Sequence, residues 1–252
     1  MKEIKRVRVL NTPVDVVEME TALEFVDVKV RAGENGNYIV AMNPEKTFAA
    51  RRDRSLGDFL DTASLLLPDG IGIVLATRFL HGERMGRLAG ADLMEAICED
   101  AASKGHRVFV YGSSEEVNRE AVAELRHRYP GVQIVGRSHG YVADDAMDGL
   151  ITEINHSGAD ILMVGLGSPR QEHWMREYGP RVTARVCLGI GGSLDTIVGR
   201  VKRAPKFLQR AGLEWLYRLV REPRRARRQA VLPVFVWSVL QEKLSGTPRK
   251  PR

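Results

Sequence analysis

The sequence predicts an α/β protein: a Rossmann-like, mostly parallel sheet with helices on both faces, followed by a basic C-terminal helical appendage. Short apolar runs alternate with amphipathic stretches through most of the 252 residues. Such alternation is typical of β-α units whose strands run parallel. In addition, the balance of charge changes sign near residue 200, which sets the last part of the chain apart.

The expected strands are short apolar runs, and the expected helices repeat apolar residues every three or four positions. The strands fall at residues 38–42, 64–67, 107–111, 132–135, 161–165 and 186–190. The clearest helices fall at residues 91–103, 115–128 and 145–155. Gly105, Gly131 and Gly158 each follow one of these helices, where a left-handed cap is expected.

Charge divides the chain into an α/β domain at residues 1–199 and a basic helical appendage at 200–244, and a stretch rich in Pro, Gly, Lys and Arg predicts a disordered tail at 245–252. From Arg200 onward there are 15 Lys or Arg against three Glu, a local charge of +12, whereas residues 1–199 carry −6. A basic segment behind a mildly acidic body indicates an anionic partner. That partner is a phosphorylated lipid, a membrane surface or a nucleic acid, and of these we expect the membrane and not nucleic acid.

Polar and glycine-rich segments follow the predicted strands. In parallel sheets ligands bind beyond the carboxyl ends of the strands, so these segments form one expected binding rim. The candidate substrate-binding residues on this rim are Asn43, Gly112, Gly167, Arg170, Gln171, Gly191, Gly192 and Asp195.

Three glycine motifs on this rim favour a phosphate ligand without matching a dinucleotide fingerprint. Gly112-Ser113-Ser114 opens a helix and could hold a diphosphate, or could be a plain turn in which a serine caps the helix. Gly165-Leu166-Gly167 and Gly189-Ile190-Gly191 lack the third glycine, because Arg170 and Leu194 stand in its place. The broken fingerprints disfavour NAD and leave a mononucleotide diphosphate open.

Asp69 is the first candidate for a general base. It lies between Pro68 and Gly70 after a predicted strand, where a carboxylate can take a proton from a hydroxyl group, although Pro-Asp-Gly is also a turn signal. Asp195 is a second candidate, with a helix cap as its alternative interpretation. The sequence has no Asp-x-Asp motif and no metal-ligand spacing, so we expect neither a metal nor a cofactor. Cys98 and Cys187 are interpreted as reduced core thiols.

The appendage has the composition of a membrane-surface anchor. Arg218, Arg221, Arg225 and Arg228 share one face of an expected helix, and residues 231–240 then form an apolar, aromatic stretch. The alternative is an ordinary helical hairpin with a solvated arginine face. No apolar run approaches the roughly 20 residues of a spanning helix, so we expect a cytosolic or peripheral protein.

Taken together, these motifs resemble the WecG/TagA/CpsF glycosyltransferase family over roughly residues 10–240. The matching blocks are Asn43-Pro44-Glu45, Pro68-Asp69-Gly70, Arg87-Leu88-Ala89-Gly90-Ala91-Asp92, Tyr111-Gly112, residues 165–172 and 191–195, Arg203-Ala204-Pro205, residues 212–218, and Glu222-Pro223. One departure is Ala41, where some members of the family carry Thr.

The resemblance implies an inverting, metal-independent transfer from a UDP-sugar to a polyprenyl-diphosphate-linked sugar in cell-wall or exopolysaccharide synthesis. The donor would carry N-acetylmannosamine, its uronic acid or a related hexose. By the same resemblance Asp69 is the base, Asn43, Arg87 and Gln171 line the donor pocket, and Arg218, Arg225 and Arg228 complete the site at the membrane.

Two other classes of protein remain as alternatives on sequence grounds. One is an NAD-dependent oxidoreductase, and the other is a non-enzymatic module that binds anionic surfaces through the appendage. The sequence leaves the oligomeric state open, and a homo-oligomer is compatible with it.

Overall fold

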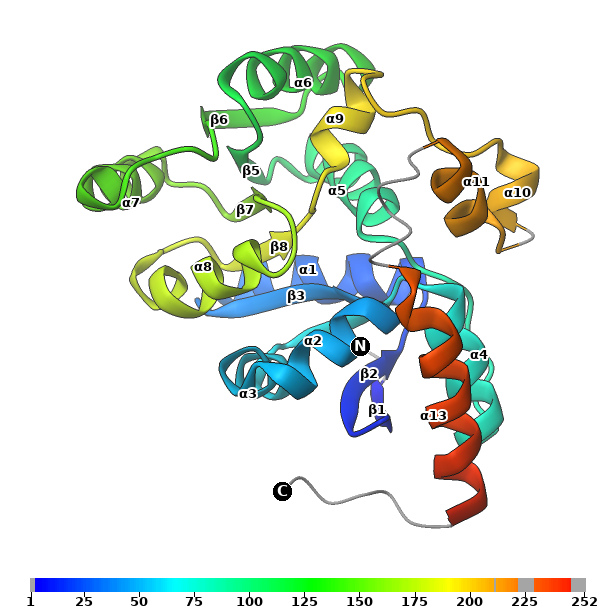
Figure 1. Ribbon diagram of the computed structural model, residues 1–252. Helices are drawn as coiled ribbons and strands as arrows, with labels where there is room; N and C mark the ends of the chain where they lie inside the picture. Colours follow the sequence, from blue (N-terminus) through cyan, green and yellow to red (C-terminus); the bar gives the residue numbers. More distant parts are fainter. Residues whose placement is uncertain (1–2, 211, 222–228, 246–252) are drawn as a thin grey trace.

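The computed structural model describes residues 3–210, 212–221 and 229–245, without the side chains of Arg210 and Arg218. Its centre is a six-stranded sheet in the order β4-β3-β8-β7-β5-β6, and every neighbouring pair of strands in it is parallel (Figure 1). The α/β prediction is therefore confirmed, with helices on both faces of the sheet.

The six expected strands are present within one or two residues of their predicted bounds, except that β6 continues three residues beyond its predicted end. They are β3 (Asn37–Met42), β4 (Leu65–Pro68), β5 (Arg107–Gly112), β6 (Gln133–Ser138), β7 (Ile161–Gly165) and β8 (Val186–Gly189).

Two apolar cores, one on each face of the sheet, hold the helices in place. Neighbouring strand residues alternate between them: Ile39 belongs to one core and Val40 to the other. One face is covered by α1 (Met19–Ala32), α5 (Gly90–Lys104), α6 (Glu115–Arg128) and α9 (Ser193–Ile197). The other is covered by α2 (Pro44–Arg52), α3 (Arg54–Thr62), α7 (Met147–Ser157) and α8 (Arg170–Tyr178), with 3₁₀ turns at Asp144–Ala146 and Gly179–Arg181.

Both cysteines lie within these cores, as predicted. Burial raises the pKa of the Cys187 thiol to about 12, and burial together with the charge of Glu95 raises that of Cys98 to about 12. Neither thiol is therefore reactive near neutral pH.

A hairpin at the start of the chain was not predicted. β1 (Lys5–Val9) pairs antiparallel with β2 (Thr12–Val16) through a turn in which Leu10 and Asn11 both have positive φ. Asp15 joins this hairpin to the sheet: its carboxylate accepts from Arg6 Nε at 2.7 Å and from the backbone N–H of Leu66 at 2.8 Å. The hairpin thus covers the edge of the sheet beside β4.

Two of the three expected glycine caps are confirmed. Gly105 and Gly158 end α5 and α7 in the left-handed conformation. Gly131 also has a positive φ, but α6 is capped by Tyr129, two residues earlier, so the prediction for Gly131 as a cap was wrong.

The C-terminal part contains α10 (Lys206–Arg210), α11 (Glu214–Arg221) and α13 (Val231–Ser245). α13 lies along α4 (Ile71–His81) at one side of the molecule (Figure 1) and buries Phe235 and Val239 in one of the two cores. It extends five residues beyond the predicted apolar stretch, because Gln241–Ser245 continue the same helix. The rest of the expected disordered tail, residues 246–252, lies outside the described residues.

Candidate active site

The parallel sheet brings all of the predicted strand ends to one edge, because the carboxyl ends of parallel strands meet there. In the order of the strands, this rim carries Asp69 after β4, Asn43 after β3, Gly191 and Gly192 after β8, Gly167 to Gln171 after β7, and Gly112 at the end of β5. β4 and β5 are four strand spacings apart, which at about 4.8 Å each gives a rim of about 19 Å between Asp69 and Gly112.

Asn43 and Asp69 occupy adjoining loops. The backbone N–H of Asp69 donates to the carbonyl of Met42 at 3.0 Å, and that of Gly70 donates to the same oxygen at 3.2 Å. Asn43 is the N-cap of α2, and its Oδ1 accepts from the N–H of Lys46 at 2.8 Å, with Pro44 as the first helical residue. A methyl group at Gly70 would lie 3.0 Å from the Pro44 ring, so only glycine fits between the two loops without a shift.

Arg87 joins Asp69 to the C-terminal part of the chain. Its Nη1 lies 3.4 Å from Asp69 Oδ1, and its Nη2 lies 3.1 Å from Glu214 Oε2 and 3.7 Å from Asp92 Oδ2. The Leu88 N–H donates to the carbonyl of Pro68 at 3.0 Å, which fixes the Arg87 loop against the strand end that carries Asp69. Three carboxylates thus surround one guanidinium group.

Arg203 supplies a second positive charge to this network. Its Nη1 donates to Asp92 Oδ1 at 2.6 Å, and its Nη2 donates to Gln209 Oε1 at 3.1 Å. Burial works to lower the pKa of Arg203, but the hydrogen bond and charge of Asp92, with the charges of Glu214 and Glu95, raise it above its ordinary value. Asp92 is therefore held chiefly by Arg203.

The other end of the rim is built from very close backbone contacts. Gly112 has φ 138°, and a methyl group there would overlap the carbonyl oxygen of Gly165, so the turn requires glycine. Ser114 caps α6 by accepting from the Val117 N–H at 3.3 Å, which confirms the turn interpretation for that serine. Asp195 does not cap a helix: it lies inside α9, whose N-cap is Gly192, and accepts from Ser113 Oγ at 3.1 Å.

Gln171 lies beneath the rim and does not project from it. Its side chain is buried, its Oε1 accepts from the Gly191 N–H at 2.8 Å, and its Nε2 donates to Glu172 Oε1 at 2.9 Å. Glu172 also pairs with Lys46 at 2.5 Å, deep in the protein. The chain Lys46–Glu172–Gln171–Gly191 ties together the loops that follow β3, β7 and β8.

Gly167 and Arg170 stand at the beginning of α8. Gly167 has φ 77° with no atom near its missing side chain, and its carbonyl accepts from the Gln171 N–H at 2.8 Å. Arg170 Nη2 donates to the carbonyl of Gly140 at 2.6 Å, and its guanidinium lies over the Tyr141 ring. Arg170 therefore reaches toward the β6 side of the rim, away from Asp69.

The appendage arginines can be followed only in part. Arg218 lies within α11, whereas Arg225 and Arg228 lie outside the described residues. The backbone before α11 fits tightly on the body: Gly212 has φ 72°, and a methyl group there would lie 2.8 Å from Ile71 Cγ1. α11 is thus fastened beside the loop that carries Asp69.

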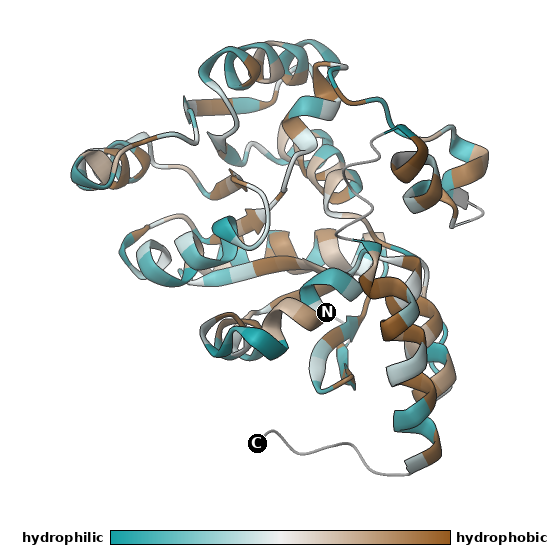
Figure 2. Cartoon of the chain, in the orientation of Figure 1, coloured by the Kyte–Doolittle hydropathy of each residue, from teal (hydrophilic) through white to brown (hydrophobic). Residues whose placement is uncertain are grey.

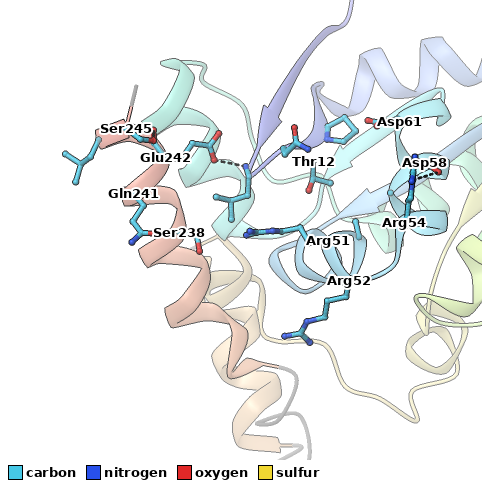
Figure 3. A pocket seen from close by; sticks show the side chains of 16 residues that line it. Thr12, Arg51, Arg52, Arg54, Asp58, Asp61, Ser238, Gln241, Glu242 and Ser245 are labelled. Atoms are coloured by element: carbon cyan, nitrogen blue, oxygen red, sulfur yellow. Dashed lines mark hydrogen bonds and ion pairs between the residues drawn. The ribbon is translucent and has the colours of Figure 1, made fainter. Parts of the chain in front are cut away.

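A cavity of about 1540 Å³ lies away from this rim, between the β1–β2 turn, the C-terminal end of α2, one side of α3, and α13 (Figure 3). Arg51 and Arg52 line it from the last turn of α2, while Asn43 caps the first turn at the rim. The acidic groups of the cavity are engaged: Asp61 pairs with Arg8 at 2.7 Å, and Glu242 accepts from the Leu10 N–H at 2.9 Å.

The sequence did not predict the residues that join the loops of the rim to one another. Lys46 stands in no motif, Ser113 entered only as part of the Gly112-Ser113-Ser114 turn, and Glu172 and Glu214 entered only as members of matching blocks. Within residues 3–210, 212–221 and 229–245, no three His, Cys, Asp or Glu side chains gather as a metal site would require.

An all-parallel sheet whose rim combines a carboxylate, arginines and glycine-rich helix starts defines a nucleotide-binding class of α/β enzyme. More particularly, the chain belongs to the glycosyl transferase WecG/TagA/CpsF family, whose family model matches residues 7–249. The protein is therefore a glycosyltransferase, as the sequence motifs predicted, and neither an oxidoreductase nor a non-enzymatic binding module.

Two relatives from Bacillus are similar over most of the chain, and both are named N-acetylglucosaminyldiphosphoundecaprenol N-acetyl-beta-D-mannosaminyltransferase. The one from Bacillus subtilis (strain 168) is 36% identical over 219 residues, which are 87% of this chain and 83% of the relative. The one from Bacillus spizizenii (strain W23) is 38% identical over 232 residues, 92% of this chain and 90% of the relative.

Proposed function

We propose that this enzyme transfers N-acetylmannosamine from its UDP-activated form to a polyprenyl-diphosphate-linked N-acetylglucosamine, with Asp69 as general base. The names of the two Bacillus relatives support both the sugar and the class of acceptor. The observation that carries the assignment of the base is the position of Asp69 at the carboxyl end of β4, beside Asn43 and 3.4 Å from Arg87.

The reaction is a single displacement at the anomeric carbon. Asp69 takes the proton of the acceptor hydroxyl while the hydroxyl oxygen forms its bond to that carbon. The bond between the anomeric carbon and the β-phosphate oxygen of UDP breaks on the opposite side, so the configuration inverts. The proton ends on Asp69, and UDP leaves with the electron pair of the broken bond.

The departing diphosphate needs compensating positive charge and backbone donors. We assign this task to the Gly112 turn at the start of α6, and to Arg218, Arg225 and Arg228 in the C-terminal part. The N-terminus of a helix as long as α6 favours phosphate through its dipole and through first-turn N–H groups other than that of Val117, which Ser114 caps. The three arginines come from the resemblance, and the fastening of α11 beside Asp69 is compatible with that role.

The other rim residues receive positioning roles. Gln171 holds Gly191, so its effect on the donor is exerted through the Gly191–Gly192 loop. Gly167, Arg170 and Asp195 surround the part of the rim nearest the Gly112 turn, where the nucleotide half of the donor would lie. Asn43 and Arg87, which stand next to Asp69, would face the transferred sugar.

The lipid acceptor requires the enzyme to work at a membrane, and we place it on the cytoplasmic face of the bacterial cell membrane. No helix of the described residues is long and apolar enough to cross a bilayer. Docking is assigned to an apolar surface of α4 and α13, made of Leu75, Phe79, Val236, Trp237, Leu240 and Leu244, all of them exposed.

This proposal is tested by Asp69→Asn, which preserves the shape of the side chain but cannot accept the proton. Transfer from UDP-N-acetylmannosamine to a short-chain polyprenyl-diphospho-N-acetylglucosamine should fall by about 10²–10⁴-fold, the usual effect of removing a general base. The dissociation constant for UDP, measured by calorimetry, should stay within about threefold, because the substitution leaves the phosphate site intact.

Asp195→Asn is the matched control, since it alters the second predicted carboxylate at the other end of the rim. It should weaken UDP binding more than it lowers turnover. Near-normal turnover by the Asp69→Asn enzyme, with a large loss for Asp195→Asn, would transfer the role of base to Asp195.

A further inference from the structure

The C-terminal part of the chain meets the proposed base through one charged side chain, Glu214. It is the first residue of α11, its side chain is only 10% exposed, and its Oε2 lies 3.1 Å from Arg87 Nη2. Of the three carboxylates around Arg87, Glu214 lies closest, as an ion pair at 3.1 Å. Asp69 accepts a hydrogen bond from Arg87 Nη1 at 3.4 Å, and Asp92 lies at 3.7 Å.

We propose that Glu214 is a positioning residue, which holds the Arg87 guanidinium by its Nη2 and so keeps it from forming a close, two-bonded pair with Asp69. This inference rests on the proposed role of Asp69 as base. It means that the position of α11, which carries Glu214, affects how readily Asp69 accepts a proton.

The geometry gives the physical reason. A guanidinium group that binds a carboxylate through two short N–H···O bonds strongly favours the charged form of that carboxylate. A base paired in this way accepts a proton poorly. In the observed arrangement only Nη1 faces Asp69, at 3.4 Å, which is longer than a charge-assisted hydrogen bond of about 2.7–2.9 Å.

The neighbouring groups cannot easily replace Glu214. Asp92 is engaged by Arg203 at 2.6 Å, and Arg203 is in turn held by Gln209. Glu214 reaches Arg87 because the chain before it is fixed, with Gly212 closely packed on Ile71 and the Leu213 N–H donating to the carbonyl of Leu208 at 2.8 Å. If α11 is displaced, Arg87 loses its closest carboxylate and Asp69 is the nearest one left.

The test is Glu214→Gln in the full-length chain, assayed with UDP-N-acetylmannosamine and a short-chain polyprenyl-diphospho-N-acetylglucosamine between pH 5 and 9. Without the Glu214 charge, Arg87 pairs more closely with Asp69, which then loses its proton at lower pH and is a weaker base. We expect kcat to fall about tenfold and the acidic limb of the kcat–pH profile to move about one unit to lower pH. The KM for the UDP-sugar should change less than kcat does.

Two further variants separate positioning from folding. Glu214→Asp keeps the charge and should restore most of the rate and the position of the acidic limb. Glu242→Gln is the matched control: Glu242 also ties the C-terminal part to the body, through the Leu10 N–H, but lies in the cavity away from the rim. Its pH profile should match that of the unaltered enzyme.

The outcomes distinguish this inference from the proposed function. Suppose that Asp69→Asn abolishes transfer but Glu214→Gln leaves the acidic limb of the kcat–pH profile where it is in the unaltered enzyme. Glu214 then does not act through Asp69, whatever the kcat of the Glu214→Gln enzyme. Failure of Glu214→Asp to restore the limb would overturn the inference as well. If Asp69→Asn remains active, the assignment of the base is wrong and the role of Glu214 is lost with it.

Discussion

At the scale of single residues, the buried ion pair between Lys46 and Glu172 sets the position of the Gly191 loop. Both side chains are at most 3% exposed, and Glu172 Oε1 is shared between Lys46 Nζ and Gln171 Nε2. A carboxylate at this depth is tolerated only because both donors reach it. The orientation of the Gln171 amide, and with it the hydrogen bond to Gly191, follows from that pairing.

Removing one charge of this pair should be costly. Glu172→Gln leaves the Lys46 ammonium buried without a counter-charge, so the free energy of unfolding should fall by about 3–5 kcal/mol. Urea denaturation followed by circular dichroism measures the change. Lys29→Met, which breaks the exposed pair with Glu34, is the control and should leave the midpoint nearly unchanged.

The Lys46–Glu172 pair can also affect UDP binding, because it orients Gln171. If it serves only stability, a Lys46→Met, Glu172→Leu double variant that refolds well should bind UDP normally. If it orients Gln171, the double variant should recover stability but still bind UDP several-fold more weakly. Equal recovery of both properties would limit the pair to a structural role.

At the scale of elements, the turn from β5 into α6 is the most constrained part of the rim. Gly112 takes φ 138° and Ser113 takes φ 58°, and the Ser113 N–H donates to the carbonyl of Gly165 at 3.0 Å. The ends of β5 and β7 approach so closely that no side chain fits at Gly112. Serine at the next position brings its hydroxyl to Asp195.

Gly112→Ala should therefore damage both folding and donor binding. The added methyl group forces the backbone away from Gly165 and strains φ, at about 1–3 kcal/mol of unfolding free energy, and UDP binding should weaken about tenfold or more. Thermal denaturation and calorimetry give the two values. Gly149→Ala on the exposed face of α7, where nothing lies within 4 Å, should instead stabilise the protein by about 0.5–1 kcal/mol.

The strands and the strand-end residues were predictable because apolar runs and glycine signals are local in sequence. Asn43 followed by Pro44 is a helix-start signal, although it was interpreted only as part of the rim. The β1–β2 hairpin also left a signal, since Val7 and Val9 alternate with arginines before Asn11. Asp69, Arg87, Asp92, Arg203 and Glu214 all stood in blocks of the sequence that resemble the family. Their contact with one another was not predictable, because the five positions are spread over 146 residues of chain.

At the scale of the whole molecule, the C-terminal helix is both part of the core and part of the outer surface. One side of α13 buries Phe235 and Val239, whereas its outer side exposes Val236 (58%), Trp237 (62%) and Leu244 (87%). The apolar colouring of α13 continues onto neighbouring α4 (Figure 2), where Leu75 is 58% exposed. Lys243 spans the two helices, with its Nζ 5.7 Å from the Phe79 ring centre and donating to the carbonyl of Leu80.

Because α13 belongs to both the core and the surface, membrane docking is better tested with point variants than by deleting α13. Removing α13 would strip Phe235 and Val239 from the core, and any loss of vesicle binding would be confounded with unfolding. The outer side chains can be changed alone, since their exposure shows that they contribute little to packing. The +12 charge of residues 200–252 adds attraction to anionic lipids, at about 1 kcal/mol for each basic residue near the surface.

Trp237→Glu combined with Leu240→Glu should therefore release the enzyme from vesicles of anionic and zwitterionic phospholipid without unfolding it. Two apolar side chains that enter the bilayer contribute about 1.5–3 kcal/mol each, so partitioning measured by co-sedimentation should fall at least tenfold. Transfer to a membrane-embedded acceptor should fall in parallel, while transfer to a short soluble acceptor should persist. Val28→Glu, an exposed apolar position on α1, is the control and should leave sedimentation unchanged. Full vesicle binding by the double variant would show that the apolar surface of α4 and α13 does not face the membrane, and would leave the arginines of the C-terminal part to account for docking.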